Sequence, residues 1–568
     1  MNAFRILVLS NARPWRAWKF ANRILGEIPG AEVCGIVQQA KEKLPPVQRL
    51  IALGHTDSSR LPAHASGKAG LASPFRSRQL TQRMLRWIHG CPRDLKDLRE
   101  FTLEDLEENC RKAGWPFLPM EAAGPEGLLD FVRRQSAGLI VVLGSLPTDP
   151  ELSSISLRGL IRTSNNEINP EDLMAGKDVV TGVEHFIAAS RSANTVASVI
   201  IPVQPYDAIL GFTLKLDLLS DDLLVQTALG LQTGSTMQAG KMVSHWTEEI
   251  ITPYLAQLKR SPQQSGPRGR QSKRFRRAWK LCLDALLLIA PYTVARNWNR
   301  RRQKQYPVVI LAHHLVSDRP HRMGISTETF WGLIRFLQSH YRIVSLSEAV
   351  ALLRSGIVDS PTVALTFDDG YADNFVSLRA VAQETETPVT LFVATSPVDQ
   401  HLEFEHDLLH AERGALPMTW AQARYWSRRG AEFGSHTRTH FDCGSTHEER
   451  LTAEIVSSKD ELERQLEQPV KFFAFPFGQP GNMSDEAAAI AADTYEHFVS
   501  CFGGENLPGE NGDAPQHLLR KNFYPDPWEL ELELQSIFDQ VEKIKRKVRW
   551  KFLDVFDPSK TLKFDSKR

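Results

Sequence analysis

Cysteine is scarce in this 568-residue sequence, which contains only six residues of this type. They are Cys34, Cys91, Cys110, Cys282, Cys443 and Cys501, and no two of them form a C-x-x-C pair. The scattered pattern excludes a dense disulfide framework and is typical of reduced, structural thiols in a cytoplasmic protein.

Long apolar runs are also absent. No stretch reaches the roughly 20 apolar residues that a membrane-spanning helix needs, so no span is expected. The apolar run at residues 6–9 is too short for the hydrophobic region of a signal peptide, and it continues into Asn-Ala-Arg-Pro. We therefore predict a buried first strand and a cytoplasmic location.

Neither sign of charge is in excess, because the formal net charge is +1. This balance excludes a broad electrostatic attraction to nucleic acid, and no nucleic-acid partner is predicted. The first half also lacks a G-x-G-x-x-G motif behind a strand, so it gives no support for a nucleotide site.

The sequence is rich in core-forming residues, with a 42% apolar fraction and 12 tryptophans. Its length exceeds what one core usually holds, so two or more domains are expected. In residues 1–258, strands such as "FRILVLS", "AEVCGIVQ" and "AGLIVVLG" read as continuous apolar runs separated by helical patterns. This predicts an α/β domain with a Rossmann-like parallel sheet covered on both faces.

Residues 259–304 are predicted to be a basic linker with an amphipathic helix. Residues 259–277 are rich in Pro, Gly, Ser, Gln and Arg, as in a linker. Residues 278–302 then flank a short apolar stretch with basic clusters and carry Trp279, Tyr292 and Trp298. Two interpretations stay open: a helix lying in the interface of an anionic membrane, or a buried interdomain helix with solvated basic ends.

Residues 305–525 return to a β/α alternation. The strand candidates are "PVVILAH", "TVALTF", "PVTLFVA", "AEFGSH", "KFFAFPFG" and "EHFVSCF". So many βα units in this length predict a (β/α) barrel, whose site lies at the carboxyl ends of the strands. The remaining segment, residues 526–568, is predicted to be a helix with a basic tail, either solvated or facing a membrane.

Four polar side chains follow the predicted barrel strands. Asp368 and Asp369 come directly after "TVALTF", and His436 and His440 come after "AEFGS". An i, i+4 spacing on a helical turn would turn both imidazoles to one side. Two histidines and one carboxylate suit a catalytic divalent metal, most simply Zn²⁺, while the second carboxylate stays free as a base.

With these motifs the region resembles the polysaccharide deacetylase family, also described as NodB-homology. The matching motifs are "TFDDGY", "HTRTH" and "FAFPFG", with "VILAHHLVSD" near the start. The resemblance implies that Asp369, His436 and His440 hold the metal. It implies further roles for Asp368 as the general base, Tyr371 as a backbone donor to the oxyanion, and Pro476, Phe477 and His314 as substrate-binding residues.

Two positions depart from the family pattern. Many members carry an arginine where this chain has Ala474, and Arg520 in "HLLRKNF" is the candidate to replace it in orienting the base. The late histidine that usually acts as general acid has no clear counterpart, so His314 and His517 are both candidates for that role.

The first half loosely resembles the formyltransferase fold through "GLIVVLGSLP" and "TGVEHFIAA". The catalytic Asn, His and Asp of that family are not readable here, and "LIRTSNNEINPEDL" contains no histidine. We therefore predict a non-catalytic domain that binds substrate or supports assembly.

The favoured function is a metal-dependent hydrolase that removes an N-acetyl group from an amino sugar of a polysaccharide or glycan precursor. A lipid-linked substrate and a peripheral position at the inner membrane face would fit the basic linker. One alternative is a glycoside hydrolase using Asp368 and Asp369, although such carboxyls should stand about 5–9 Å apart. Another is a catalytically inactive membrane-associated scaffold or carbohydrate-binding protein.

Overall fold

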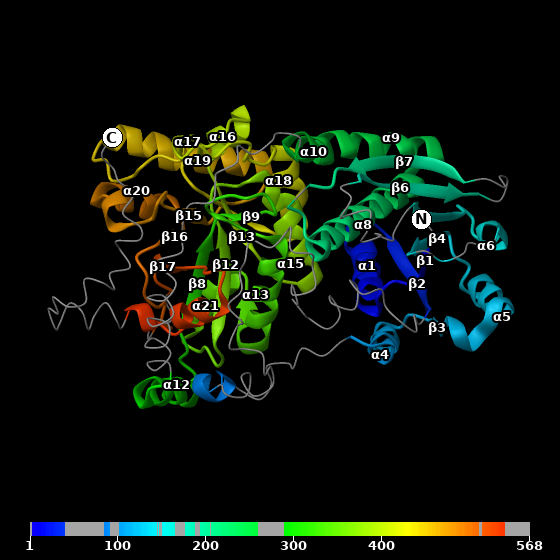
Figure 1. Ribbon diagram of the computed structural model, residues 1–568, viewed down its shortest axis with the longest axis horizontal. Helices are drawn as coiled ribbons and strands as arrows, with labels where there is room; N and C mark the ends of the chain where they lie inside the picture. The colour runs from blue at the N-terminus through cyan, green and yellow to red at the C-terminus, as the bar shows by residue number, and fades with distance from the viewer. Residues whose placement is uncertain are drawn as a thin grey trace.

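The computed structural model describes residues 3–39, 85–90, 101–144, 146, 150–164, 177–187, 193–204, 206–258, 289–509 and 514–539. Cys91, Cys282, Trp279, most of the predicted linker and the basic tail therefore lie outside the described residues. The four described cysteines are free, and three of them are buried. Figure 1 shows two α/β units side by side, the N-terminal one in blue to green and the C-terminal one in green to red.

The N-terminal unit is built on a seven-stranded sheet with the order β3-β2-β1-β4-β5-β6-β7. Its strands are β1 (Phe4–Ser10), β2 (Ala31–Gln38), β3 (Phe117–Pro119), β4 (Leu139–Leu143), β5 (Leu160–Ser164), β6 (Val179–Phe186) and β7 (Asn194–Ile201). The first five strands are parallel, which confirms the predicted sheet. β6 and β7 extend it in antiparallel register, which differs from the predicted parallel sheet.

The helices of this unit are α1 (Pro14–Glu27), α4 (Leu103–Ala113), α5 (Met120–Gln135), α6 (Pro150–Ile155), α8 (Ile209–Thr233), α9 (Thr236–Trp246), η3 (Thr247–Ile251) and α10 (Thr252–Leu258). α8 is buried on nearly all sides. It contacts β5, β6 and α1 of its own unit and also α13, η4 and α15 of the C-terminal unit. A helix that is buried on nearly all sides needs partners on every face, and here both units supply them.

The C-terminal unit is a closed parallel barrel of seven strands. In order around the barrel they are β12 (Thr362–Phe367), β13 (Thr390–Val393), β14 (Glu432–Ser435), β15 (Phe472–Ala474), β16 (His497–Ser500), β17 (His517–Asn522) and β8 (Val308–His313). β8 pairs with β12 to close the ring. β11 (Arg342–Val344) pairs with the first half of β12, and β9 (Leu315–Val316) with β10 (Gly324–Ile325). The predicted barrel is confirmed.

Helices surround this barrel. They are α12 (Pro291–Gln303), α13 (Thr327–His340), α14 (Leu346–Ser355), η4 (Asn374–Leu378), α15 (Arg379–Thr385), α16 (Thr395–Gln400), α17 (Glu405–Leu409), α18 (Trp420–Ser427), α19 (Glu448–Leu466), η5 (Pro480–Asn482), α20 (Asp485–Thr494) and α21 (Pro527–Leu534). α14 shows how local sequence sets these boundaries: Ser345 and Glu348 form a capping box at its start, and Gly356 ends it in the left-handed region. Among the described residues, no helix is both long and apolar enough to cross a membrane.

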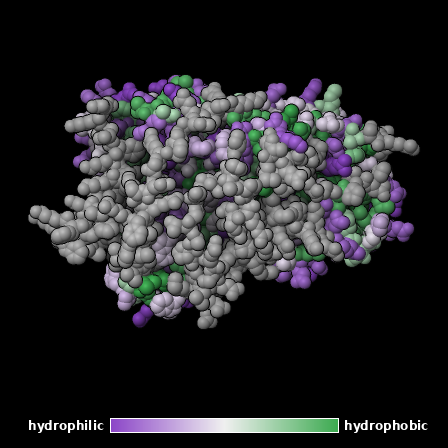
Figure 2. Space-filling model, viewed as in Figure 1, coloured by the Kyte–Doolittle hydropathy of each residue, from purple (hydrophilic) through white to green (hydrophobic). Residues whose placement is uncertain are grey.

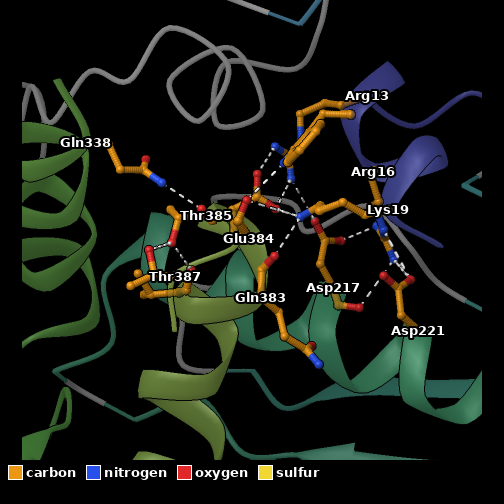
Figure 3. Close-up of polar contacts among 12 residues, drawn as sticks. Arg13, Arg16, Lys19, Asp217, Asp221, Gln338, Gln383, Glu384, Thr385 and Thr387 are labelled. Atoms are coloured by element: carbon orange, nitrogen blue, oxygen red, sulfur yellow. Dashed lines mark hydrogen bonds and ion pairs between the residues drawn. The ribbon is translucent and has the colours of Figure 1, made fainter. Parts of the chain in front are cut away.

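A buried ionic network joins the two units (Figure 3). Glu384 at the end of α15 accepts hydrogen bonds from Arg13 and Lys19, with 2.6 Å between Arg13 Nη1 and Glu384 Oε1. Arg16 pairs with Asp217 and Asp221 of α8. Charges removed from water need such partners, so the network fixes how α1, α8 and α15 meet.

Residues 85–90 fall within the predicted N-terminal domain but lie against the barrel. Leu85 and Ile88 pack in one cluster with Leu532 and Ile537 near the C-terminal end of the described chain. His89 pairs with Glu531 in the same region. This short segment therefore adds a second connection between the two halves of the chain.

Candidate metal centre

The turn after β12 separates the two aspartates. Asp369 has φ +70° and Gly370 has φ +87°, so two consecutive residues are left-handed. A Cβ on Gly370 would come within 3.1 Å of the Val393 side chain, so glycine is required here for conformation and for space. The turn sends Asp368 toward β17 and Asp369 toward the loop after β14.

Asp369, His436 and His440 converge as the motif predicts. One carboxylate oxygen, Asp369 Oδ1, lies 3.6 Å from His436 Nε2 and 3.2 Å from His440 Nε2. Among the described residues, these three form the one group whose ligand atoms all lie within 4.8 Å of one another. Such spacings are those expected between ligands that share one divalent ion at about 2.0–2.2 Å.

The expectation that the two histidines share a helical turn is wrong. Residues 436–440 form an irregular loop after β14, in which Thr437 has φ +62° and His440 has φ +60°. His436 Nδ1 lies 2.8 Å from the carbonyl oxygen of Ala474 and can donate to it, which leaves Nε2 directed at Asp369. The imidazoles thus meet because of a bent loop and a fixed tautomer rather than helical periodicity.

The chemistry of these three side chains fits a bound cation. Both carboxylate oxygens of Asp369 are buried and accept no hydrogen bond, although three imidazole nitrogens lie 3.2–3.6 Å away. Burial opposes ionisation of this carboxyl, but His406 and His440 hold the pKa of Asp369 well below its usual range. Burial lowers the pKa of His436 to about 4, which keeps it in the neutral form that metal ligands require.

Asp368 is held by Arg520. Arg520 Nη1 donates to Asp368 Oδ1 at 2.6 Å and Nη2 donates to Oδ2 at 2.9 Å, while Nη1 also donates to Thr366 Oγ1 at 3.1 Å. Both partners of the pair are buried. Burial would raise the pKa of Asp368, but the Arg520 guanidinium lowers it, so the carboxyl is ionised and fixed in direction. Ala474 contributes only its backbone carbonyl to this region.

The other predicted residues differ in how they lie relative to the group of Asp369, His436 and His440 and the Asp368–Arg520 pair. Phe477 is 51% exposed, and its ring centre is 4.9 Å from that of His440, while Pro476 before it is buried. His314 follows β8. Burial lowers the pKa of His314, and the negative charge of Asp369 acts in the opposite direction. The Tyr371 hydroxyl donates to Asp407. The oxyanion role of the Tyr371 backbone N–H stays a prediction.

His517, a candidate general acid, is not brought to the metal ligands. It lies at the amino end of β17, with Nε2 2.6 Å from Ser500 Oγ and its ring stacked on Phe498. The predicted metal ligands follow the carboxyl ends of β12 and β14, which is the other end of the barrel.

Sequence reasoning missed His406 and Asp407 in α17. His406 Nε2 lies 3.5 Å from Asp369 Oδ2, and Asp407 accepts from the Tyr371 hydroxyl at 2.8 Å. The segment between β13 and β14 carries "EHDLLH", whose alternation of acids and histidines was the available signal. It stands at no fixed spacing from the recognised motifs, so only the fold brings it to the site.

Comparisons with known proteins agree with the motifs. Residues 355–495 match the family model for polysaccharide deacetylase, which confirms the predicted resemblance over that segment. YxkH of Bacillus subtilis (strain 168), whose name refers to polysaccharide deacetylation, is 22% identical over 190 residues, 33% of this chain. The alignment spans 63% of that relative's length.

Three solved structures are similar to parts of the chain. The deacetylase PplD of Streptococcus pyogenes, in complex with acetate, is 22% identical at a TM-score of 0.34, covering 41% of this chain and 98% of its own. IcaB from Ammonifex degensii is 20% identical at a TM-score of 0.35, covering 40% and 97%. Phosphoribosylglycinamide formyltransferase from Bacillus halodurans is 11% identical at a TM-score of 0.24, covering 42% and 95%.

Proposed function

We propose that this chain, whose residues 355–495 match the polysaccharide deacetylase family model, hydrolyses the N-acetyl amide of an amino sugar in a polysaccharide or glycan precursor. One observation carries the proposal. A cluster of ligand atoms from Asp369, His436 and His440 lies next to an ionised Asp368 that Arg520 holds in direction. Amide hydrolysis needs both parts, because the carbonyl must be polarised and the attacking water must lose a proton.

Each side chain has a defined task in this proposal. Asp369, His436 and His440 would hold a divalent cation, with zinc favoured by the donor set, and when bound it supplies Lewis-acid chemistry. Asp368 accepts the proton of the attacking water, and Arg520 keeps its carboxylate in place. The Tyr371 backbone N–H donates to the developing oxyanion, and Phe477 offers an exposed ring to the sugar face.

The test is acetate release from N-acetylated oligosaccharides by the full chain loaded with zinc. We expect acetate release that falls by about 10²–10⁴-fold in Asp368→Asn, because a positioned base contributes that much. Asp369→Ala should lose both zinc and activity. Acetate release that is unchanged in Asp368→Asn would overturn the assigned mechanism.

The two alternatives predict different products. A glycoside hydrolase would release new reducing ends without acetate. It would need one protonated carboxyl as general acid, but the surroundings lower the pKa of both Asp368 and Asp369. An inactive scaffold would release neither product. The intact ligand cluster and base argue against a scaffold, since each would otherwise be a buried charge kept at a cost in stability.

We propose an anionic membrane surface as the partner of α12 and residues 85–90. Tyr292 is 67% exposed, Trp298 45% and Trp87 56%, and the Trp298 indole N–H donates to the Trp87 carbonyl at 3.1 Å. Arg302 and Lys304 are exposed near these rings. Figure 2 shows apolar residues among polar ones at the lower left, where Figure 1 places α12. Aromatic rings beside basic groups are typical of interfacial contacts.

Co-sedimentation with vesicles tests this partner. We expect the chain to bind vesicles that contain phosphatidylglycerol more strongly than pure phosphatidylcholine vesicles, with binding reduced by salt. The triple variant Trp87→Ala, Tyr292→Ala, Trp298→Ala should bind less. Equal recovery of wild type and variant with both vesicle types would exclude this surface as the membrane contact.

A further inference from the structure

We infer that His406 is a positioning residue of the metal centre, which holds one oxygen of Asp369 so that the other faces His436 and His440. The inference rests on the metal site of the proposed function. It adds a group from α17, an element outside the motifs that define the ligands. Among the described residues, the cluster of ligand atoms within 4.8 Å of one another does not include His406, so it acts beside the ligands.

The two oxygens of Asp369 face different partners. Oδ1 lies 3.6 Å from His436 Nε2 and 3.2 Å from His440 Nε2, whereas Oδ2 lies 3.5 Å from His406 Nε2. A carboxylate on a single bond can rotate about χ2, and that torsion is broad. The polar contact of His406 Nε2 with the second oxygen is not a hydrogen bond, but it favours the orientation in which the first oxygen points at the histidines.

The position of His406 is itself fixed by its neighbours. Its ring stacks on Phe404, with centroids 5.4 Å apart and an interplanar angle of 24°. Its ring centre lies 4.6 Å from that of His440, and its side chain is 13% exposed. A ring packed between two aromatic neighbours has few rotamers left, so its Nε2 stays near Asp369.

The tautomer of His406 follows from a chain of hydrogen bonds. The Tyr371 hydroxyl donates to Asp407 Oδ2 at 2.8 Å, so its oxygen is an acceptor for His406 Nε2, 3.0 Å away. Nε2 therefore carries the proton, which it donates to Tyr371, and it lies 3.5 Å from Asp369 Oδ2. His321 Nε2 lies 3.3 Å from Asp407 Oδ1 and supports the far end of this chain.

Donors of this kind adjust metal affinity without touching the ion. Losing a partner of a ligating side chain typically costs 10–100-fold in metal affinity or activity. We therefore expect His406→Ala to bind zinc about 10–100-fold more weakly, as measured by competition with a chromophoric chelator. His406→Gln should recover most of this loss, because its amide nitrogen reaches the position of Nε2 and keeps a donor there.

Two further variants make the test specific. Tyr371→Phe removes only the hydroxyl that orients His406, so it should weaken zinc binding in the same direction by a smaller factor. His401→Asn, in the same segment, is the control. His401 is exposed with φ +54°, a conformation that asparagine tolerates, so zinc affinity should not change.

The absorption spectrum of the cobalt(II)-substituted chain provides a readout independent of activity. We expect the visible bands to shift or lose intensity in His406→Ala and to return toward wild type in His406→Gln. Wild-type zinc affinity and an unchanged cobalt spectrum in a folded His406→Ala chain would overturn the role of His406 alone. A wild-type chain that takes up neither ion would overturn both this inference and the metal site beneath it.

Discussion

Four residues with a strained backbone lie around the candidate metal centre. Asp369, Thr437, His440 and Phe477 all have φ between +60° and +70° without being glycine. A residue held in this region costs about 1–3 kcal/mol, and it persists only where the surrounding structure over-determines it. Three of these residues hold or flank the ligands and the fourth forms the exposed rim. The strained backbone therefore lowers the stability of the barrel while it orients these side chains.

Replacing Arg520 should slow the chemical step without weakening substrate binding. In Arg520→Lys the charge remains but the two-point contact with Asp368 is lost, so we expect kcat for acetate release to fall about 10–100-fold. KM should change little, because the guanidinium is buried behind the base and offers nothing to the sugar. Steady-state kinetics measure both constants, and a rise in KM with unchanged kcat would contradict this role.

Stability should respond to Arg520 as well. Arg520→Met leaves Asp368 as a buried charge without its main partner, which typically costs about 3–5 kcal/mol. Chemical unfolding of the two variants beside wild type measures this difference. A methionine variant as stable as the lysine variant would mean that the pair contributes little to folding.

At the scale of elements, the turn after β12 carries the most specific constraint. Gly370→Ala should destabilise the chain by about 1–2 kcal/mol through its left-handed backbone. It should also weaken zinc binding, because the new methyl group would press on Val393 and displace the neighbouring Asp369.

Gly430→Ala is the matched control for this turn. Gly430 has φ +93° but nothing within 4 Å of its would-be Cβ, so it carries the backbone penalty without the crowding. Both variants should lower the midpoint of thermal unfolding, and only Gly370→Ala should lower zinc affinity. Equal zinc affinity in the two variants would show that the ligands do not depend on the shape of this turn.

The strands that could be predicted from the sequence are those whose residues are apolar throughout. Continuous apolar runs predicted β1, β4, β8 and β12 because a strand buried on both faces must be apolar throughout. β17 does not read as a strand, since Arg520 and Lys521 stand in its middle. They are buried there only because distant acids pair with them.

The residues of the candidate site could be predicted from the sequence only in part. The motifs "TFDDGY" and "HTRTH" predicted that Asp369, His436 and His440 come together, and the structure brings their ligand atoms within 4.8 Å of one another. The bent loop that joins the histidines depends on left-handed residues that no periodicity reveals. His406 depends on where α17 packs, and this is decided by tertiary contacts with Tyr371 and His440.

For the whole molecule, the ionic network between the units predicts how stability responds to acid. Burial alone would raise the pKa of Glu384, but Arg13 and Lys19 lower it to about 2. Because the folded-state pKa is lowered, this contribution is complete above the unfolded value of about 4.3 and is lost as pH falls toward 2.

Glu384→Gln tests the network. At pH 7 we expect a loss of roughly 3 kcal/mol in the free energy of unfolding, the value that a shift of this size implies. The gap to wild type should stay constant down to about pH 5 and close between pH 4.5 and 2. Urea unfolding at several pH values measures it. Glu449→Gln, at an exposed site, is the control, and a gap that does not vary with pH would contradict the assignment.

The position of α8 between the two units limits where the chain can be truncated in engineering. A gene fragment that begins after this helix would encode a barrel whose α13 and α15 are stripped of their apolar cover, and such a product should aggregate. The two units are therefore expected to fold and unfold together rather than independently.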